Sequence, residues 1–335
     1  MSRIFMTGFE DGSTNAFTAV NSVSIETSQK RTGSYSARMN GWDDYCRYVF
    51  SSTVDELYIR FAWYPTGDFN QQKVGIFSLY NASGTQVILG VDRTSLCLET
   101  YRNTTLLDSS SVALLFTAWN VIECHIKIAD APDGIFTVKL NGSQVIASTG
   151  DTQAQATAGA TTLQFGQLYI ASGNTAPYGY LDDIAVNDTS GSTNNSWVGP
   201  GGIRPLLVNG AGNHTGLTPS TGSNYQCVDE VPASDTDYVY GSEVDAYDLY
   251  AVNNAALPDT IAVSAVRWIA RAKVANDAAN ITPVIRSGST TQQQSDIALS
   301  TSYTVKSLIM NVDPTDSEDW TLDKVKALEI GAAIG

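Results

Sequence analysis

The densest group of oxygen-bearing side chains in the sequence lies in residues 229–248, and such groups are the ligands that calcium prefers. Asp235 and Asp237 are two positions apart, as the first two ligands of a calcium loop are. Val239 and Ala246 then occupy the fifth and twelfth positions of such a loop, so the EF-hand pattern fails. We expect a solvated acidic loop. The alternative is a structural calcium ion, with Asp235, Asp237, Glu243 and Asp245 as candidate ligands.

Catalytic patterns are absent from the sequence. Hydrolysis by acids on one strand needs carboxylates at alternating positions, and the nearest match, Glu243-Val-Asp245-Ala-Tyr-Asp248, ends in aspartate. The two histidines, His125 on an expected solvated strand face and His214 in a Gly/Asn-rich loop, leave a nucleophile-His-acid triad few ways to form. No glycine-rich nucleotide loop occurs. We therefore predict no catalytic residue, no cofactor-binding residue and no enzymatic activity; the alternative is that carboxylates converge from separate strands.

Four aromatic side chains in the first half are candidates for binding a sugar: Trp42, Tyr45, Trp63 and Tyr64. Aromatic rings stack on the apolar faces of pyranoses, and Tyr and Trp add a polar group at the rim. The same residue types also fill the cores of β-sandwiches, which is the simpler interpretation. The sequence leaves both interpretations open.

Composition excludes several classes of partner. The 335 residues include 34 Asp and Glu against 19 Lys and Arg, giving a formal net charge of −15 that repels nucleic acid and anionic membrane surfaces. No segment approaches the roughly 18 apolar residues of a membrane span, and the N-terminus lacks an apolar run of signal-peptide length. The four cysteines are far apart, so we expect reduced thiols, with Cys124 in a core.

The first half has the pattern of short strands separated by turns that is typical of an antiparallel sandwich. Asn141-Gly142 favours a type I′ hairpin, and residues 181–188 alternate with a period of two. The strands predicted here are 34–39, 45–51, 56–64, 73–80, 86–91, 96–100, 119–129, 135–140, 143–148, 161–170 and 180–186. Asp43-Asp44 and Asp182-Asp183 are interpreted as turn and strand-end residues.

A linker over residues 191–203 divides the chain, because Gly199-Pro-Gly-Gly202 breaks regular structure and is typical of a hinge. The predicted domains are therefore 1–190 and 204–335. The second domain is predicted to be a smaller sandwich with strands at 235–240, 244–252, 261–274, 282–287, 295–299 and 304–312. One short helix is expected within residues 319–330, N-capped by Thr321 and ended by Gly331.

Five segments of the first half occur in an order that resembles the concanavalin A-like lectin/glucanase jelly roll, including its laminin G-like branch. They are Gly8-Phe-Glu10, residues 31–38, residues 119–125, Val138-Lys-Leu-Asn-Gly142 and Gly179-Tyr-Leu-Asp-Asp-Ile-Ala-Val186. The resemblance covers residues 1–190 and implies a lectin-like jelly roll. The fold class expected for the whole chain is all-β, with two β-sandwich domains and at most one short C-terminal helix.

The join between the halves, residues 182–199, and the ending, residues 313–331, resemble a layout common in virion proteins of tailed bacteriophages. This resemblance implies a structural protein on the outside of a phage head or tail, folded in the host cytoplasm without a signal peptide. Its expected partners are other virion proteins of the capsid or tail, further copies of itself, and a host surface glycan. Neither nucleic acid nor membrane insertion is expected.

The function predicted from these observations is non-enzymatic. The protein is expected to be a virion protein on the exterior of the head or tail, with a decoration, fibre or tail-associated adhesion role that uses protein and glycan contacts. The rival prediction is a free carbohydrate-binding protein or a glycan hydrolase of bacterial origin. A third, a purely architectural spacer, predicts no ligand.

Overall fold

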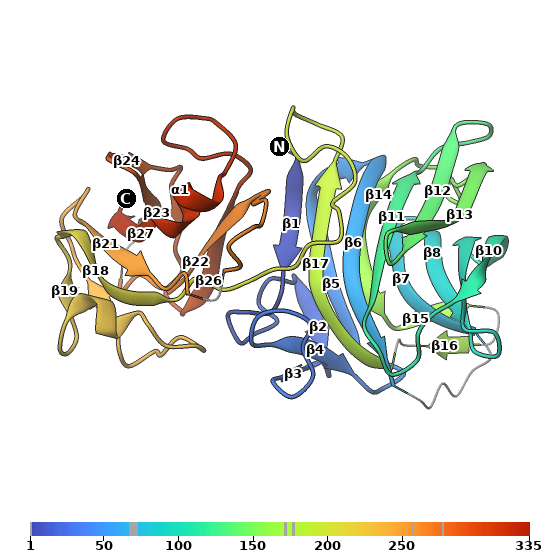
Figure 1. The fold of residues 1–335 in the computed structure, drawn as a ribbon, viewed down its shortest axis with the longest axis horizontal. Helices are drawn as coiled ribbons and strands as arrows, with labels where there is room; N and C mark the ends of the chain where they lie inside the picture. Colours follow the sequence, from blue (N-terminus) through green and yellow to red (C-terminus); the bar gives the residue numbers. More distant parts are fainter. Residues whose placement is uncertain (1, 67–72, 171–172, 176–177, 256, 277) are drawn as a thin grey trace. The chain divides into compact units, whose positions relative to one another are not determined.

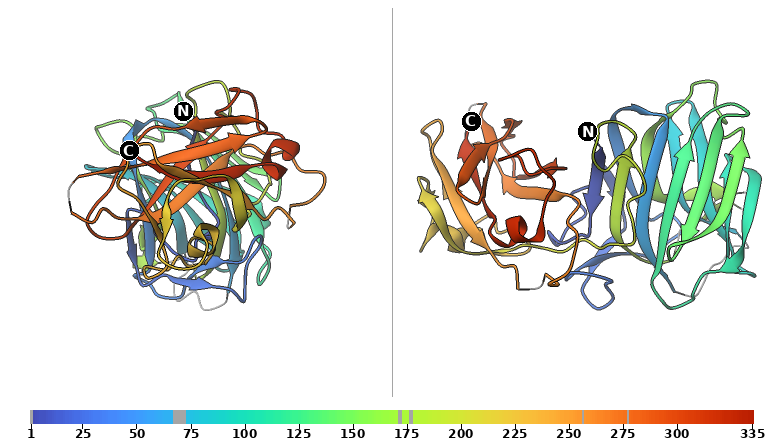
Figure 2. Two further views of the ribbon diagram at one scale, coloured as in Figure 1. Left: turned by 90° about the vertical axis from the view of Figure 1, so that its left-hand side faces the viewer. Right: turned by 45° about the horizontal axis from the view of Figure 1, so that its top comes forward.

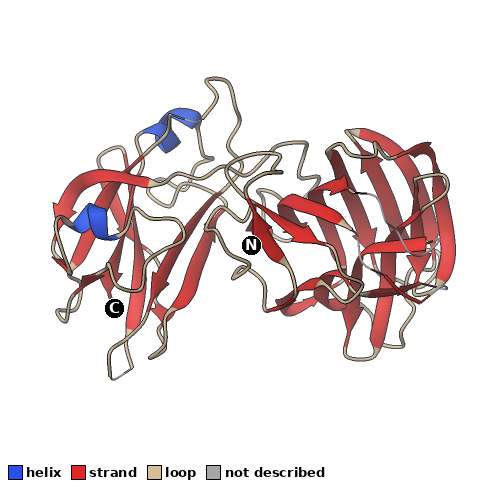
Figure 3. Cartoon of the chain, turned by 90° about the horizontal axis from the view of Figure 1, so that it is seen from below, coloured by secondary structure: helices blue, strands red, loops and turns tan. Residues whose placement is uncertain are grey.

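The computed structural model describes residues 2–335 except 67–72, 171–172, 176–177, 256 and 277. Antiparallel strands dominate it, and its helical elements are η1 (Asn224–Cys227) and α1 (Leu322–Lys326) (Figure 3). The chain forms two compact units, residues 1–203 and 204–335. No helix in the described ranges is long and apolar enough to cross a membrane. The expected all-β class with one short C-terminal α-helix is confirmed.

The first unit contains two large antiparallel sheets whose long strands run side by side (Figures 1 and 2). The eight-stranded sheet has the order β13 (Ser143–Gly150), β12 (Gly134–Leu140), β11 (Asn120–Lys127), β6 (Glu56–Pro65), β17 (Gly179–Asp188), β4 (Ser36–Met39) and β3 (Ser24–Glu26), with β1 (Arg3–Thr7) also paired to β17. The seven-stranded sheet has the order β10 (Thr105–Ala113), β9 (Cys97–Arg102), β8 (Gly84–Asp92), β7 (Lys73–Asn81), β14 (Ala160–Gly166), β5 (Tyr45–Val54) and β2 (Ala19–Asn21).

The core of this unit lies between the two sheets because alternate residues of their strands point inward. Phe61 of the eight-stranded sheet meets Phe77 and Phe165 of the seven-stranded sheet, with ring centroids 5.8 and 5.2 Å away. All three are fully buried, and burying each contributes roughly 1.5–3 kcal/mol. Cys124 is also fully buried, as predicted. The predicted hairpin turn is confirmed too, since Asn141 and Gly142 both have positive φ.

The predicted strand 161–170 is wrong, because the chain changes direction within it. Gly166 has φ +77 and Gln167 has φ +44, so β14 ends and β15 (Leu168–Ile170) pairs with β16 (Gly173–Thr175) in a separate hairpin. A Cβ on Gly166 would lie 2.2 Å from the carbonyl oxygen of Asp44, which leaves room only for glycine. Five strands of the first unit were not predicted: β1, β2, β3, β10 and β16. Most are short, and β10 lacks an apolar alternation because it is an edge strand exposed on both faces.

The second unit is a smaller arrangement of the same kind. Its largest sheet has the order β18 (Val208–Thr215), β21 (Tyr247–Val252), β27 (Glu329–Ile334), β23 (Asn280–Ser287) and β24 (Thr290–Gln293), with β25 (Ile297–Ala298) also on β23. Two-stranded sheets are formed by β19 (Thr218–Pro219) with β20 (Val239–Tyr240), and by β22 (Val266–Ala272) with β26 (Thr304–Met310). A core around Trp268, Ile285 and Trp320 joins β22 and β26 to the largest sheet.

Two predictions for the second unit need correction. The predicted strand 261–274 is regular only over β22, and the expected helix extends only over α1. Thr321 caps α1 as predicted, because its hydroxyl accepts from the Lys324 amide at 3.3 Å. Gly331 does not cap the helix. It lies in β27, where a Cβ would be 1.7 Å from the carbonyl oxygen of Asp248 on β21, so glycine permits two strands to pair closely.

Within the predicted linker, residues 195–203, which we call the strap, are bound to the rest of the first unit. Arg31 donates to the carbonyl oxygens of Pro200 and Gly201, each at 3.0 Å. The Gly199 amide donates to Glu123 at 2.8 Å. The ammonium group of Lys139 lies 3.7 Å from the ring centroid of Trp197 in the strap. The glycines therefore bend the strap along the sandwich instead of forming a hinge.

Asp182 and Asp183 are not strand-end residues, because both are fully buried at a bulge in the middle of β17. Asp183 has φ +54 and forms an ion pair with Arg31 at 2.6 Å. Its carboxylate also accepts from the Thr32 hydroxyl and from the Ile203 amide of the strap, each at 2.6 Å. One buried carboxylate thus fixes the loop before β4 and the end of the strap together.

Two acidic side chains near this ion pair, Asp182 and Glu10, have raised pKa values. Burial, with the Asp183 charge beside it, raises the pKa of Asp182 to about 8. Burial also raises the pKa of Glu10 to about 7, although the Ser34 and Tyr35 amides donate to its carboxylate. Both pKa values lie above those of the unfolded chain, so the folded state binds these protons more tightly. Stability contributed by the protonated forms is full below about pH 4 and is lost as the pH rises towards 8.

We expect Glu10→Gln to flatten the fall in the free energy of unfolding between pH 5 and pH 7, because glutamine keeps an acceptor for Ser34 without a titrating group. Urea unfolding of the full chain at pH 5, 6, 7 and 8 measures this. Glu26→Gln, on the partly exposed β3, is the control and should follow the wild-type curve. A Glu10→Gln curve parallel to wild type would contradict the prediction.

Candidate glycan-binding face

The outer face of the seven-stranded sheet displays a cluster of polar and aromatic side chains where β5, β14 and β7 adjoin. Arg47 pairs in register with Gln164, and Gln164 with Ser78, so one row crosses three strands. Because Cys46 and Phe165 on the same strands belong to the core, the side chains of Arg47 and Gln164 point away from it. Alternation along the strands therefore aims this row outward.

The guanidinium of Arg47 is held in one orientation by Gln164. Its Nε and Nη2 groups donate to Oε1 of Gln164 at 3.0 and 2.8 Å. The amide nitrogen of Gln164 donates in turn to the carbonyl oxygens of Gly166 and Gln167, at 2.9 and 3.0 Å. Gln164 is buried, so its own position is set by the backbone turn after β14. The turn that ends β14 thereby orients the arginine.

Two tyrosines flank this arginine. The guanidinium carbon of Arg47 lies 4.9 Å from the ring centroid of Tyr45 and 5.5 Å from that of Tyr80. All three side chains are half-buried, which leaves part of each accessible. Partial burial raises the pKa of Tyr80. We call Tyr45, Arg47, Tyr80 and Gln164 the arginine face.

Trp42 lies in the loop that leads directly into Tyr45 and is 57% exposed. Asp44 shapes this loop, because its carboxylate accepts from the amides of Asn40 and Gly41, both at 2.8 Å. The side chain of Asn21 on β2 donates to the carbonyl oxygen of Asp43 at 2.9 Å and ties the loop to the sheet edge. Asp43 and Asp44 are turn residues, as predicted.

A second polar cluster on the same sheet is internally paired. Lys73 forms ion pairs with Glu99 and, at 2.8 Å, with Asp92, and the Tyr101 hydroxyl donates to Glu99. The bond from Lys73 lowers the pKa of Asp92 to about 2. Leu168 of the β15–β16 hairpin packs with Tyr101, and a Cβ on Gly75 would lie 2.6 Å from the Leu168 side chain. The hairpin therefore covers part of this sheet, including Ile88, which pairs with Ser78 of the row described above.

The four aromatic residues predicted to bind sugar do not form one platform. Trp63 is fully buried in the core, so the glycan interpretation of this residue is wrong. Tyr64 lies on the eight-stranded sheet, where its ring centroid is 5.6 Å from that of Trp119 and 5.9 Å from that of Tyr180. Trp42 and Tyr45 remain at the edge of the arginine face.

Sequence reasoning missed Arg47, Tyr80 and Gln164. These residues come from three strands spread over more than a hundred positions, and their proximity follows only from the order β7-β14-β5. The one available signal was the alternation Tyr45-Cys-Arg47, which puts a tyrosine and an arginine on the same face of a strand.

The calcium candidates are dispersed. Asp235 forms a bidentate pair with Arg271 at 2.5 and 2.7 Å, and Asp237 accepts from the Ser220 hydroxyl at 3.3 Å. Glu243 and Asp245 are exposed. Within the described ranges, no three His, Cys, Asp or Glu side chains are grouped so that they could hold a metal ion.

Neither histidine belongs to the arginine face: His125 is on the other sheet of the first unit, and His214 is in the second unit. His125 on β11 accepts or donates a hydrogen bond with Glu56 at 2.7 Å and stacks on Tyr58. His214 lies on strand β18, not in the predicted loop, and stacks on Tyr247 with ring centroids 3.9 Å apart. Cys46, Cys97, Cys124 and Cys227 are all free thiols, in agreement with the prediction.

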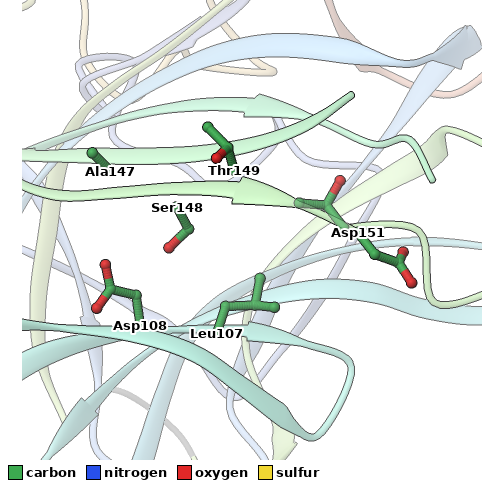
Figure 4. A pocket seen from close by; sticks show the side chains of 7 residues that line it. Leu107, Asp108, Ala147, Ser148, Thr149 and Asp151 are labelled. Carbon is green, nitrogen blue, oxygen red and sulfur yellow. The ribbon is translucent and has the colours of Figure 1, made fainter. Parts of the chain in front are cut away.

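A shallow pocket of about 300 Å³ lies between the edge strands β10 and β13 (Figure 4). Its lining includes Asp108, Ser148 and Asp151. Asp151 forms an ion pair with Arg102, and the Asp108 carboxylate accepts from the Ser109 amide at 2.8 Å. Both carboxylates therefore already have partners within the chain.

The fold defines a class: an all-β protein with a jelly-roll-like β-sandwich followed by a smaller β-domain. No protein-family model and no curated protein sequence matches the chain.

Several solved structures are distantly similar to the chain. An endo-β-1,4-glucuronan lyase from the fungus Trichoderma reesei is 16% identical, with 56% of this chain and 96% of that one covered and a TM-score of 0.41. A carbohydrate esterase from the Shiga toxin-encoding bacteriophage phi24B is 14% identical, with 56% and 99% covered and a TM-score of 0.40. A SAP-like pentraxin from Limulus polyphemus is 17% identical, with 49% and 74% covered and a TM-score of 0.34. Likeness of this degree assigns no activity to the chain.

We expect Trp63→Ala to lower the free energy of unfolding by roughly 3–5 kcal/mol, because it leaves a cavity in the core. Trp42→Ala should change it by less than about 0.5 kcal/mol, since that ring is largely exposed. Chemical denaturation of the full chain measures both values. Equal effects of the two substitutions would show that the core and surface assignments are incorrect.

Proposed function

We propose that the protein is a non-enzymatic structural protein that binds glycans through the arginine face. The observation that carries this proposal is the guanidinium of Arg47 held between the rings of Tyr45 and Tyr80 on the outside of a sheet. Rings of this kind offer area to the apolar faces of sugars, and oriented N–H groups offer hydrogen bonds to their oxygens. This combination matches the amphipathic chemistry of a saccharide.

Preorganisation supports this assignment. Gln164 fixes Arg47 before any ligand arrives, and tyrosine rings have few torsions to immobilise. A ligand therefore meets a surface whose conformational entropy has already been reduced on folding, which favours affinity from a small contact area. Trp42, on the adjoining loop, adds an exposed ring that can extend the contact along a chain of sugars.

Binding without turnover is supported by the way the acidic groups are used. Glu99 and Asp92 beside the face pair with Lys73, and Asp151 in the pocket pairs with Arg102. His125 pairs with Glu56. A general acid or base must be within reach of substrate in a suitable protonation state, and these groups are instead engaged within the fold.

We further propose that this binding serves a phage particle, with the protein on the exterior of the head or tail. The support is the whole-chain resemblance to virion proteins of tailed bacteriophages, together with two β-rich domains of which one suits adhesion and the other attachment. Many copies on one particle, or a homo-oligomer contacting other virion proteins, would combine weak glycan contacts through avidity. A free bacterial carbohydrate-binding protein or glycan hydrolase is the rival proposal, and a spacer without any ligand is the third.

We expect the full chain to bind at least one class of oligosaccharide on a glycan array. Tyr80→Ala should weaken binding to the strongest ligand by 10-fold or more, because it removes one wall of the face. Calorimetric titration provides the dissociation constants. Tyr64→Ala is the matched control, a half-buried tyrosine on the other sheet, and should leave them unchanged. Equal losses in the two variants would place the binding surface elsewhere.

We also expect the chain in phage particles purified by density gradient from the source culture. Quantitative mass spectrometry measures its copy number. Hundreds of copies indicate a head decoration or repeated tail component, and a few copies indicate a fibre or tail-tip part. Absence from particles would rule out the virion role while leaving glycan binding to the array experiment.

A further inference from the structure

We propose that the arginine face selects glycans that carry a carboxylate, such as uronic or sialic acid residues, and that Arg47 binds the carboxylate. This inference rests on the proposed glycan-binding function and narrows it to acidic sugars. It concerns the charge of the ligand, which the aromatic rings of the face do not specify.

The first argument is that Arg47 has no counter-charge. Within the described part of the chain, no carboxylate lies within ion-pair distance of its guanidinium, although acidic residues outnumber basic ones by 34 to 19. Several other cations on the sandwich do form ion pairs, such as Lys73 with Asp92 and Glu99, and Arg38 with Glu26. A half-buried guanidinium left unpaired among so many acids is available to an external anion.

The second argument is the geometry of the fork. A guanidinium has five N–H groups, and Gln164 occupies two of them through Nε and Nη2. Among the described residues, the guanidinium of Arg47 forms no hydrogen bond other than these two, so its Nη1 side is available. Planar guanidinium N–H groups match the two oxygens of a carboxylate better than a point charge would.

The third argument is that the supports of Arg47 are neutral. Gln164 orients the arginine without cancelling its charge, whereas a glutamate at this position would have formed an internal ion pair. The rings of Tyr45 and Tyr80 lie 4.9 and 5.5 Å from the guanidinium carbon, and the partial desolvation of the half-buried Arg47 strengthens its attraction to an anion. The surroundings therefore fix the cation in place and leave its charge uncompensated.

Recognition of an acidic sugar must be local in this protein. The net charge of −15 repels polyanions at long range, but at 0.15 M salt this repulsion is screened beyond about 8 Å. A direct Arg–carboxylate contact in a partly buried face is screened much less. Binding should therefore be measured at this ionic strength.

The test uses three acidic probes, oligogalacturonate, oligoalginate and sialyllactose, each beside its carboxyl-reduced counterpart. Calorimetric titration of the full chain should show at least one acidic probe binding 10-fold or more tightly than its neutral counterpart. Arg47→Gln should abolish this preference and change the affinity for the neutral counterpart by less than twofold. Arg47→Lys keeps the positive charge but loses the planar guanidinium, and should retain only part of the preference. This variant provides a second measurement if the Arg47→Gln variant folds poorly.

Arg38→Gln is the matched control, because Arg38 also lies over a tyrosine, Tyr180 at 5.8 Å, but is on the eight-stranded sheet and paired with Glu26. It should leave all affinities unchanged. If acidic and neutral probes bind equally, or if only neutral or sulfated glycans on the array bind, carboxylate selection is overturned while glycan binding stands. If Arg47→Gln weakens both members of a pair equally, Arg47 acts only as a support of the face, which also overturns the inference. If no glycan of any class binds, the proposed function itself fails.

Discussion

The ion pair between Arg31 and the fully buried Asp183 is the interaction that joins a central strand of the sandwich, the loop before β4 and the strap. It lies at the bulge of β17, where that strand stops pairing with β4 and begins pairing with β1. A charge pair in a core contributes little over an apolar substitute, but losing one partner leaves an uncompensated charge that costs about 3–5 kcal/mol. Here the pair also specifies geometry, because the same carboxylate holds Thr32 and the strap residue Ile203.

This arrangement makes the two outer faces of the sandwich unequal. On the eight-stranded sheet, the strap packs its Trp197 against Tyr58, His125 and Lys139. These three side chains are therefore engaged by another segment of the chain. On the seven-stranded sheet, the β15–β16 hairpin covers the region around Gly75 and Gly90. What remains open on the second face is the region of Tyr45, Arg47 and Tyr80. The covering segments therefore determine which chemistry is left for a ligand.

The acidity of the chain and the cationic character of this face are complementary features. Four cations of the first unit, Arg31, Arg38, Lys73 and Arg102, form ion pairs with neighbouring carboxylates. An oriented guanidinium without a carboxylate partner is a distinct local feature of an acidic protein, and such a contrast provides specificity more than affinity. Weak, selective contacts of this kind suit a protein present in many copies, where avidity supplies the strength.

The sequence by itself determined the all-β class, most strands of the first unit, the Asn141-Gly142 turn, the Thr321 cap and the burial of Cys124, because these depend on alternation and local backbone preference. Local signals also indicated the division near residue 203. Only the tertiary structure decided that Trp63 is core, that Asp182 and Asp183 are buried, and that residues 329–334 form a central strand. Strand order alone brings Arg47, Tyr80 and Gln164 together. Local patterns record which face of a strand a residue occupies, but not which strand lies beside it, and that pairing is set by the packing of the whole sandwich.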